Sequence, residues 1–116
     1  MKKRMDERRS KAPEVGSADG EFVVRAMTYN IHSCVNANRE VNPQNVASII
    51  GELDADIVAL QEVDVEKTIG GKHNQARILS EILNMDYLFF PVESNGLHAF
   101  GLAILSCFSF EEYYYD

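Results

Sequence analysis

The stretch DADIVALQEVD, residues 54–64, joins a short apolar run to a group of acidic side chains. The run IVAL, residues 57–60, is continuous rather than alternating, which is typical of a strand covered on both faces. Residues 54–55 precede the run as a turn, and Glu62 follows it almost at once. The pattern therefore predicts a buried strand whose C-terminal end presents a carboxylate at the edge of a sheet.

The segment before this strand predicts a second strand and a helix. FVVRAMTY, residues 22–29, is rich in β-branched and aromatic residues and predicts a strand, and residues 30–41 form a polar loop. Asn42 is a good N-cap, and Pro43 suits the first helical position. The apolar stripe of the predicted helix consists of Val46, Ile49, Ile50 and Leu53. The first folding unit is thus a strand, a helix and a strand parallel to the first.

The segment after the central strand predicts a second helix and a hairpin. Gly70 and Gly71 break the chain, and a helix is expected from Asn74 to Asn84, with four apolar residues on its inner side: Ile78, Leu79, Ile82 and Leu83. Strands at 87–91 and 100–108, joined by the turn ESNG, are close enough to pair as a hairpin. The predicted class is α/β with a mixed sheet rather than a purely parallel one.

Length and charge limit the classes of protein. A chain of 116 residues fits one domain, here residues 21–116, preceded by a flexible charged tail at 1–20. The tail holds six basic and four acidic residues, whereas the remainder holds five basic and fourteen acidic ones. Such an acidic body does not favour a nucleic-acid partner, although a local site that works through a cation stays open. No apolar run reaches the roughly 20 residues of a membrane span, and two cysteines without CxxC spacing suggest a reduced, cytoplasmic protein.

Polar residues follow both predicted parallel strands. Asn30 ends the first and Glu62 follows the second, so their side chains are expected to lie side by side where open α/β sheets bind ligands. Amide and carboxylate oxygens suit Mg²⁺, which takes one or two protein carboxylates and keeps several waters. From the residues alone, a second interpretation stays open, in which both side chains only cap strands and contact solvent.

Three stretches together resemble the endonuclease/exonuclease/phosphatase superfamily, which includes the DNase I-like enzymes: MTYNIHS at 27–33, DADIVALQEVD at 54–64 and GLAILSC at 101–107. The resemblance implies the N-terminal half of a four-layer αββα sandwich, a mixed sheet with helices on one face. It also implies an enzyme, a Mg²⁺-dependent phosphoesterase with Mn²⁺ as the alternative ion, that hydrolyses phosphodiesters or phosphomonoesters. The identity of the phosphate-ester substrate stays open.

The resemblance also implies roles for single residues. Glu62 matches the metal-binding Glu of the family, and Asn30 matches the Asn that lies beside the metal and orients the site. His32 would be catalytic, bonded to the phosphate or to a metal-bound water; a solvated loop histidine is the alternative. Three further side chains are expected on surface loops without a role: Asp64, His73 and His98.

The chain departs from the family pattern in its last third. It holds no S-D-H, G-D-x-N or [TV]-x-H-L segment, and the family uses the first of these for its general base. Cys107 stands where the family has Arg, Ser109 where it has Pro, and EEYYYD follows at 111–116. We therefore expect a partial domain, truncated at its C-terminus, with little or no turnover as an isolated chain.

The sequence leaves two other interpretations of the chain. One is a catalytically inactive remnant or a partner-binding module, whose bare apolar sheet face and unpaired edge strand YLFFP would recruit another chain or aggregate. The other, a small nucleotide-binding protein, lacks a Gly-rich loop after the first strand.

Overall fold

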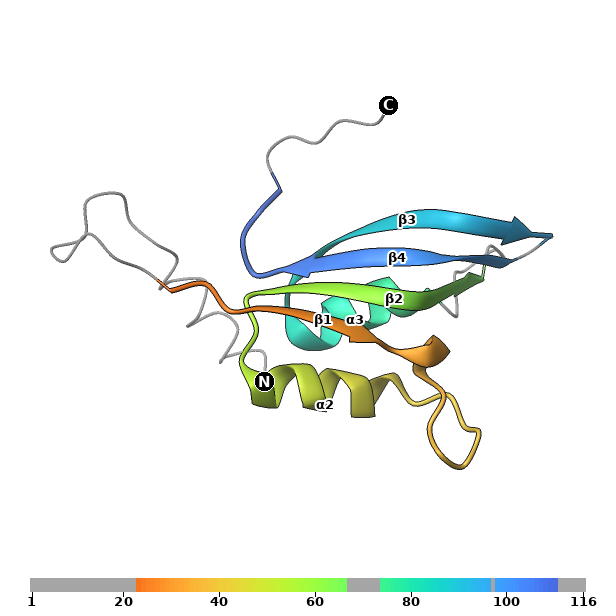
Figure 1. Ribbon diagram of the computed structural model, residues 1–116, viewed down its shortest axis with the longest axis horizontal. Helices are drawn as coiled ribbons and strands as arrows, with labels where there is room; N and C mark the ends of the chain where they lie inside the picture. Colours follow the sequence, from red (N-terminus) through yellow and green to blue (C-terminus); the bar gives the residue numbers. More distant parts are fainter. Residues whose placement is uncertain (1–22, 67–73, 97, 111–116) are drawn as a thin grey trace, which may run out of the picture.

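The computed structural model describes residues 23–66, 74–96 and 98–110 as one sheet with two helices (Figure 1). The predictions for the tail at 1–20, for His73 and for 111–116 lie outside these residues. The elements in chain order are β1 (Ala26–Asn30), the short 3-10 helix η1 (His32–Cys34), α2 (Pro43–Leu53), β2 (Ile57–Glu66), α3 (Gln75–Leu83), β3 (Asp86–Asn95) and β4 (His98–Ser106).

The sheet is mixed, as predicted, with the strand order β1-β2-β4-β3. β1 and β2 are parallel and are connected through α2, whereas β4 is antiparallel to both β2 and β3. β3 lies at one edge of the sheet and β1 at the other. This order brings the C-terminal end of β1 beside the middle of β2.

Both helices begin and end with the residues that the sequence indicates. The Asn42 side chain accepts a hydrogen bond from Asn45 N (3.1 Å), which caps α2 next to the proline in its first turn. Asn74 caps α3 in the same way through Arg77 N (3.0 Å), and Asn84 ends α3 in a left-handed conformation. The predicted helix limits are therefore confirmed to within a residue.

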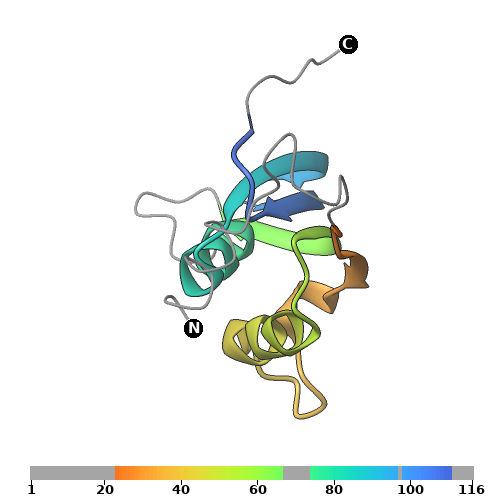
Figure 2. The same ribbon diagram turned by 90° about the vertical axis from the view of Figure 1, so that its left-hand side faces the viewer.

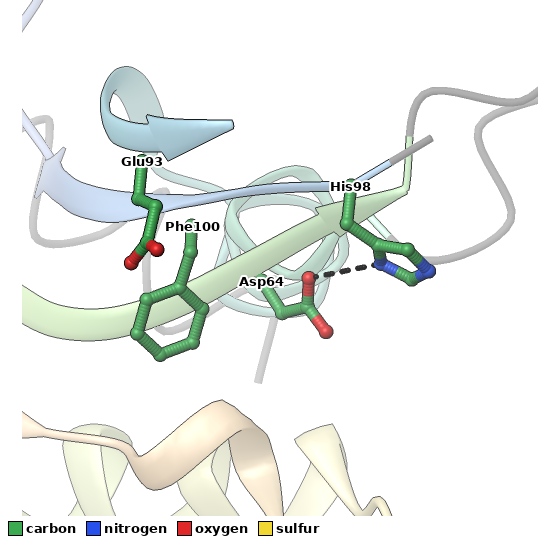
Figure 3. A pocket seen from close by; sticks show the side chains of 4 residues that line it. All are labelled: Asp64, Glu93, His98 and Phe100. Carbon is green, nitrogen blue, oxygen red and sulfur yellow. Dashed lines mark hydrogen bonds and ion pairs between the residues drawn. The ribbon is translucent and has the colours of Figure 1, made fainter. Parts of the chain in front are cut away.

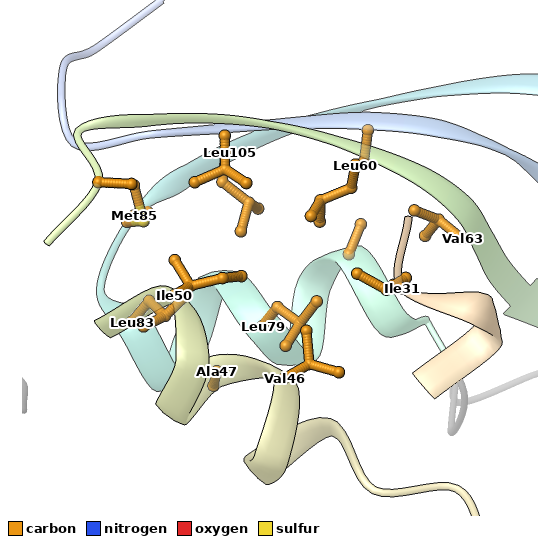
Figure 4. Close-up of a cluster of buried hydrophobic side chains, with 14 of the residues drawn as sticks. Ile31, Val46, Ala47, Ile50, Leu60, Val63, Leu79, Leu83, Met85 and Leu105 are labelled. Carbon is orange, nitrogen blue, oxygen red and sulfur yellow. The ribbon is translucent and has the colours of Figure 1, made fainter. Parts of the chain in front are cut away.

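Both helices pack against the same face of the sheet (Figures 1 and 2). The core between the two layers consists of the buried side chains of α2, α3 and the helix-facing residues of the strands (Figure 4). On α2 these are Val46, Ala47 and Ile50. The predicted stripe was wrong at Leu53, which is 58% exposed because it is the last residue of the helix and lies outside the core.

The opposite face of the sheet carries apolar residues from three strands and is not covered by either helix. Cross-strand rows on this face include Ala59 with Ile104 and Leu88, and Phe90 with Leu102. Ala59 is exposed and Leu102 is 45% exposed. The prediction that β2 is covered on both faces was wrong for the described residues, since both helices pack on one side.

The hairpin is longer than predicted and contains a close backbone approach. β3 bulges between Pro91 and Glu93, opposite Gly101 of β4. A Cβ atom on Gly101 would lie 2.2 Å from the Phe90 carbonyl oxygen, so this position needs a glycine. His98 was expected in a loop; it is instead the first residue of β4, because the antiparallel ladder continues to Glu66.

Candidate functional site

The C-terminal end of β1 turns sharply through the side chain of Asn30. Its Oδ1 accepts a hydrogen bond from the backbone N–H of His32 (3.0 Å), an arrangement that closes a turn two residues after the strand. Ile31 N donates to Gln61 O (3.1 Å), so the first residue after β1 still pairs with β2. Asn30 and His32 are thus fixed beside β2 at the level of Gln61.

Glu62 lies in the middle of β2, at a β-bulge. The ladder with β4 shifts between Leu60 and Val63, so that Gln61 and Glu62 together oppose one residue of β4. The prediction that β2 ends near Glu62 was therefore wrong: the strand continues to Glu66 because β4 goes on pairing with it. The bulge, rather than a strand end, sets the position of this carboxylate.

The turn and the bulge bring two of the predicted site residues together. His32 Nδ1 lies 3.7 Å from Glu62 Oε1, and the two side chains are 77% and 37% exposed. A shallow hollow of about 300 Å³ is lined by His32, Ser33, Val35 and Glu62. His32 therefore contacts the two other predicted site residues: its backbone N–H bonds to Asn30, and its ring lies beside Glu62.

Four residues of the turn and the bulge have an unusual backbone. His32, Ser33 and Cys34 have consecutive φ angles of 53°, 55° and 58°, and Glu62 has a φ of 56°. Left-handed conformations are unfavourable for residues with a Cβ, by about 1–2 kcal/mol each. Such strain persists only where surrounding contacts hold it, and it is concentrated at binding and catalytic sites.

The donor set fits a hard divalent cation in part. Glu62 offers a carboxylate that is one-third exposed, and Asn30 offers an amide oxygen with two lone pairs, of which the His32 N–H uses one. Within the described residues, no group of three or more His, Cys, Asp or Glu side chains could hold a metal ion. These side chains suit an ion that keeps most of its waters, as Mg²⁺ does.

A second polar pair lies further along β2. Asp64 was expected on a loop, but it belongs to β2, and its Oδ1 lies 3.4 Å from His98 Nδ1 (Figure 3). Glu93 and Phe100 complete a hollow of about 280 Å³ around this pair. Phe100 of β4 pairs with Asp64 of β2 on one side and with Glu93 of β3 on the other. The three residues therefore lie in a row across the sheet.

Cys34, at the end of η1, belongs to the core rather than to the site. Its side chain is 2% exposed, and burial raises the pKa of the thiol to about 11. The thiol is therefore protonated at neutral pH and is a poor nucleophile or metal ligand. It anchors the left-handed turn to the hydrophobic core.

A family model matches most of the chain. Residues 21–113 match the PGAP2IP, C-terminal nuclease-like domain, a branch of the endonuclease/exonuclease/phosphatase superfamily. This chain belongs to that nuclease-like domain family. The match covers both the Asn30 turn and the Glu62 bulge, as well as the GLAILSC strand.

Solved structures of the superfamily share the fold. An endonuclease/exonuclease/phosphatase from Beutenbergia cavernae aligns with a TM-score of 0.59 and 24% identity, over 77% of this chain and 27% of the other. A family protein from Leptotrichia buccalis aligns with a TM-score of 0.58 and 23% identity, over 78% and 39%. The nuclease-like chain thus spans well under half the length of these relatives. No curated protein matches it.

One site residue was not predicted from the sequence. Gln75, the first residue of α3, is 4% exposed and bonds to both Ser33 and Asp64. A pattern in the sequence could have identified it: Gln75, Leu79 and Leu83 recur every four residues on the buried side of this helix. A polar residue inside such a stripe needs a partner in the core.

Proposed function

We propose that this nuclease-like domain contributes a Mg²⁺ site to a phosphoesterase, with Mn²⁺ as a substitute ion. The observation that supports it is the 3.7 Å contact between His32 and Glu62 at a strained turn and bulge, beside Asn30. In this proposal Glu62 binds the ion, Asn30 orients the turn, and His32 bonds to the phosphate or to a water on the ion. The ion would neutralise the charge of a phosphate ester during attack by water.

Family membership supports the substrate class, a phosphodiester or phosphomonoester, without naming the compound. The acidic composition does not favour a nucleic acid, because a polyanion is repelled by a surface with an excess of carboxylates. The chain holds no S-D-H segment, so the residues of this site bind and orient rather than supply a general base. Ion binding is therefore a sharper test than turnover.

The test compares Mn²⁺ binding, followed by electron paramagnetic resonance, in the wild type, Glu62→Gln and Asp64→Asn. Asp64 is the matched control, because it is a carboxylate two residues further along the same strand. We expect Glu62→Gln to weaken Mn²⁺ binding at least about 10-fold, since a neutral amide replaces the only charged ligand proposed. Asp64→Asn should bind like the wild type. Equal affinity in all three proteins would rule the Glu62 site out.

Hydrolysis of bis-p-nitrophenyl phosphate with Mg²⁺ or Mn²⁺ gives the second readout. Any turnover should disappear in Glu62→Ala, because the bound ion is needed to neutralise the phosphate. Turnover that survives this substitution would contradict the proposal.

A second candidate function, a non-catalytic binding module, is favoured by the uncovered apolar face of the sheet. The exposed Leu102 and its neighbour Phe90 would pack against another apolar sheet face. Absence of Mn²⁺ binding, together with association that depends on Leu102, would favour this candidate over the enzyme.

A further inference from the structure

Gln75 carries a primary amide into the interior of the molecule. It is 4% exposed and occupies the first position of α3, directly after the N-cap Asn74. A buried amide that lacks hydrogen bonds is strongly unfavourable, and for that reason its partners are informative. An apolar residue at this position of the buried helix stripe would need no hydrogen-bond partners.

Both ends of this amide have a partner in the candidate site. Nε2 donates to the carbonyl oxygen of Ser33 (2.5 Å), the middle residue of the left-handed turn. Oε1 accepts from the backbone N–H of Asp64 (3.0 Å), two residues after Glu62. One side chain therefore joins the segment that carries His32 to the segment that carries Glu62.

Both of these segments need to be held. The turn has three consecutive left-handed residues, and the bulge has a fourth at Glu62. Neither conformation is the one that the free chain prefers, so each depends on contacts with its surroundings. Ser33 lies 42 residues from Gln75 in the sequence, which makes this a tertiary rather than a local restraint.

We propose that Gln75 is a positioning residue that fixes the separation of His32 and Glu62 by bonding both the turn, at Ser33, and the strand just after the bulge, at Asp64, to the same helix. Its influence on ion affinity rests on the proposed function, whereas its hold on the two backbone segments does not. A simpler role, satisfaction of a buried amide for stability alone, predicts no effect on the site beyond a loss of stability.

The variants are Gln75→Leu, which keeps the volume and removes both hydrogen bonds, and Gln75→Asn, which keeps the amide but is one methylene too short to span both partners. Ser80→Ala is the matched control. Ser80 is also a buried polar residue of α3, 6% exposed, but its hydroxyl bonds within the helix to Arg77 O (2.7 Å). Its removal should lower stability without reaching the site.

Three quantities are measured on the full chain: Mn²⁺ affinity, amide hydrogen exchange at Asp64, and the urea midpoint. For Gln75→Leu and Gln75→Asn we expect a loss of about 10- to 100-fold in Mn²⁺ affinity, the usual effect of removing a group that orients a ligand. The Asp64 amide should exchange at least about 10-fold faster, because its acceptor is removed in Gln75→Leu and out of reach in Gln75→Asn. Ser80→Ala should change the urea midpoint and leave the other two quantities unchanged.

A double-mutant cycle locates the effect. In a Glu62→Gln background, Gln75→Leu should cause no further loss of Mn²⁺ affinity if it acts through Glu62. Should a folded Gln75→Leu keep both the wild-type Mn²⁺ affinity and the slow Asp64 exchange, the positioning role would be refuted. Gln75→Asn provides the same test if the leucine variant does not fold.

The two proposals can fail separately. If the wild type binds no Mn²⁺, the proposed function is wrong, and the positioning role then rests on Asp64 exchange and on the NMR shifts of the His32 ring and the Glu62 amide. Selective change at these positions in the Gln75 variants, absent in Ser80→Ala, would still support the restraint. Uniform change across the sheet would contradict it.

Discussion

Asp54 and Asp56 are two residues apart, and both interact with Arg25, yet their environments differ. Asp54 forms an ion pair with the Arg25 guanidinium (2.7 Å) in which the side chains are 34% and 62% exposed. Asp56 is 8% exposed and accepts a hydrogen bond from the Arg25 backbone N–H (2.8 Å). Its own backbone bonds to Arg25 and to Cys107, so it joins β1, β2 and the end of β4.

Asp56→Ala should therefore destabilise the protein much more than Asp54→Ala. Loss of the Asp56 carboxylate leaves a backbone donor without its acceptor, which is unfavourable by about 1–3 kcal/mol. The exposed Asp54 pair contributes at most about 1 kcal/mol. Urea unfolding of both variants gives the comparison, and equal losses would contradict the burial argument.

The buried thiol of Cys34 predicts a pH dependence of stability. Below pH 9.0 the thiol is protonated in both states; above it, the unfolded thiol ionises while the folded one, with a pKa of about 11, does not. The free energy of unfolding should fall between these values, by up to about 1.4 kcal/mol per pH unit. Urea unfolding from pH 8 to 11 measures the slope.

The control for this prediction is Cys34→Ala. Any other group that ionises in this range is the same in both proteins, so it does not contribute to the difference between them. The variant should show a shallower decline than the wild type. Identical slopes would mean that the Cys34 thiol is not the source of the dependence.

Among the elements, β2 shows how a strand can present a functional residue from its middle. Its alternation is regular through Leu60, and the bulge at Gln61 and Glu62 shifts the register before Val63 returns to the core. The extra residue leaves Glu62 outside the regular ladder, at the level where β1 ends. The bulge is accordingly the local feature on which the candidate site depends.

The left-handed φ of Glu62 leads to a prediction about the relative stability of glycine and alanine at this position. Glu62→Gly should be more stable than Glu62→Ala by about 1 kcal/mol, since glycine adopts this conformation without strain. At the neighbouring Gln61, whose φ is not positive, the order should reverse and alanine should be the more stable. Thermal unfolding of the four variants tests both statements, and greater stability of Glu62→Ala would disprove the strain.

The part of the chain that the structure describes has two layers, and neither of its helices covers the second face of the sheet (Figure 2). No helix among the described residues is long and apolar enough to cross a bilayer. The exposed apolar residues of the sheet and the edge strand β3 are features suited to association with another sheet.

We predict that the chain self-associates through this face and that Leu102→Lys reduces the association. Leu53→Lys is the matched control, because Leu53 is also an exposed leucine, at 58%, but lies at the end of α2 on the helix side. Sedimentation velocity over a range of concentrations should show a smaller species for Leu102→Lys only. A monomeric wild type, or equal effects of both substitutions, would contradict the prediction.

Local signals in the sequence determined much of this protein. Asparagine caps and apolar periodicity predicted both helices, strand composition predicted the mixed sheet, and the motifs around Asn30 and Glu62 indicated the family. These features could be predicted because they depend on residues within about four positions of one another, or on short patterns.

Only the tertiary structure determined how the site is assembled. The bulge depends on pairing with β4, the His32–Glu62 contact on the turn after β1, and the Gln75 bonds on partners 11 and 42 residues away. The pairing of β2 with β4 also explains why the side chains of Asp64 and His98, both expected on loops, lie side by side on adjacent strands. Such contacts depend on the alignment of distant strands and helices, which no short stretch of sequence specifies.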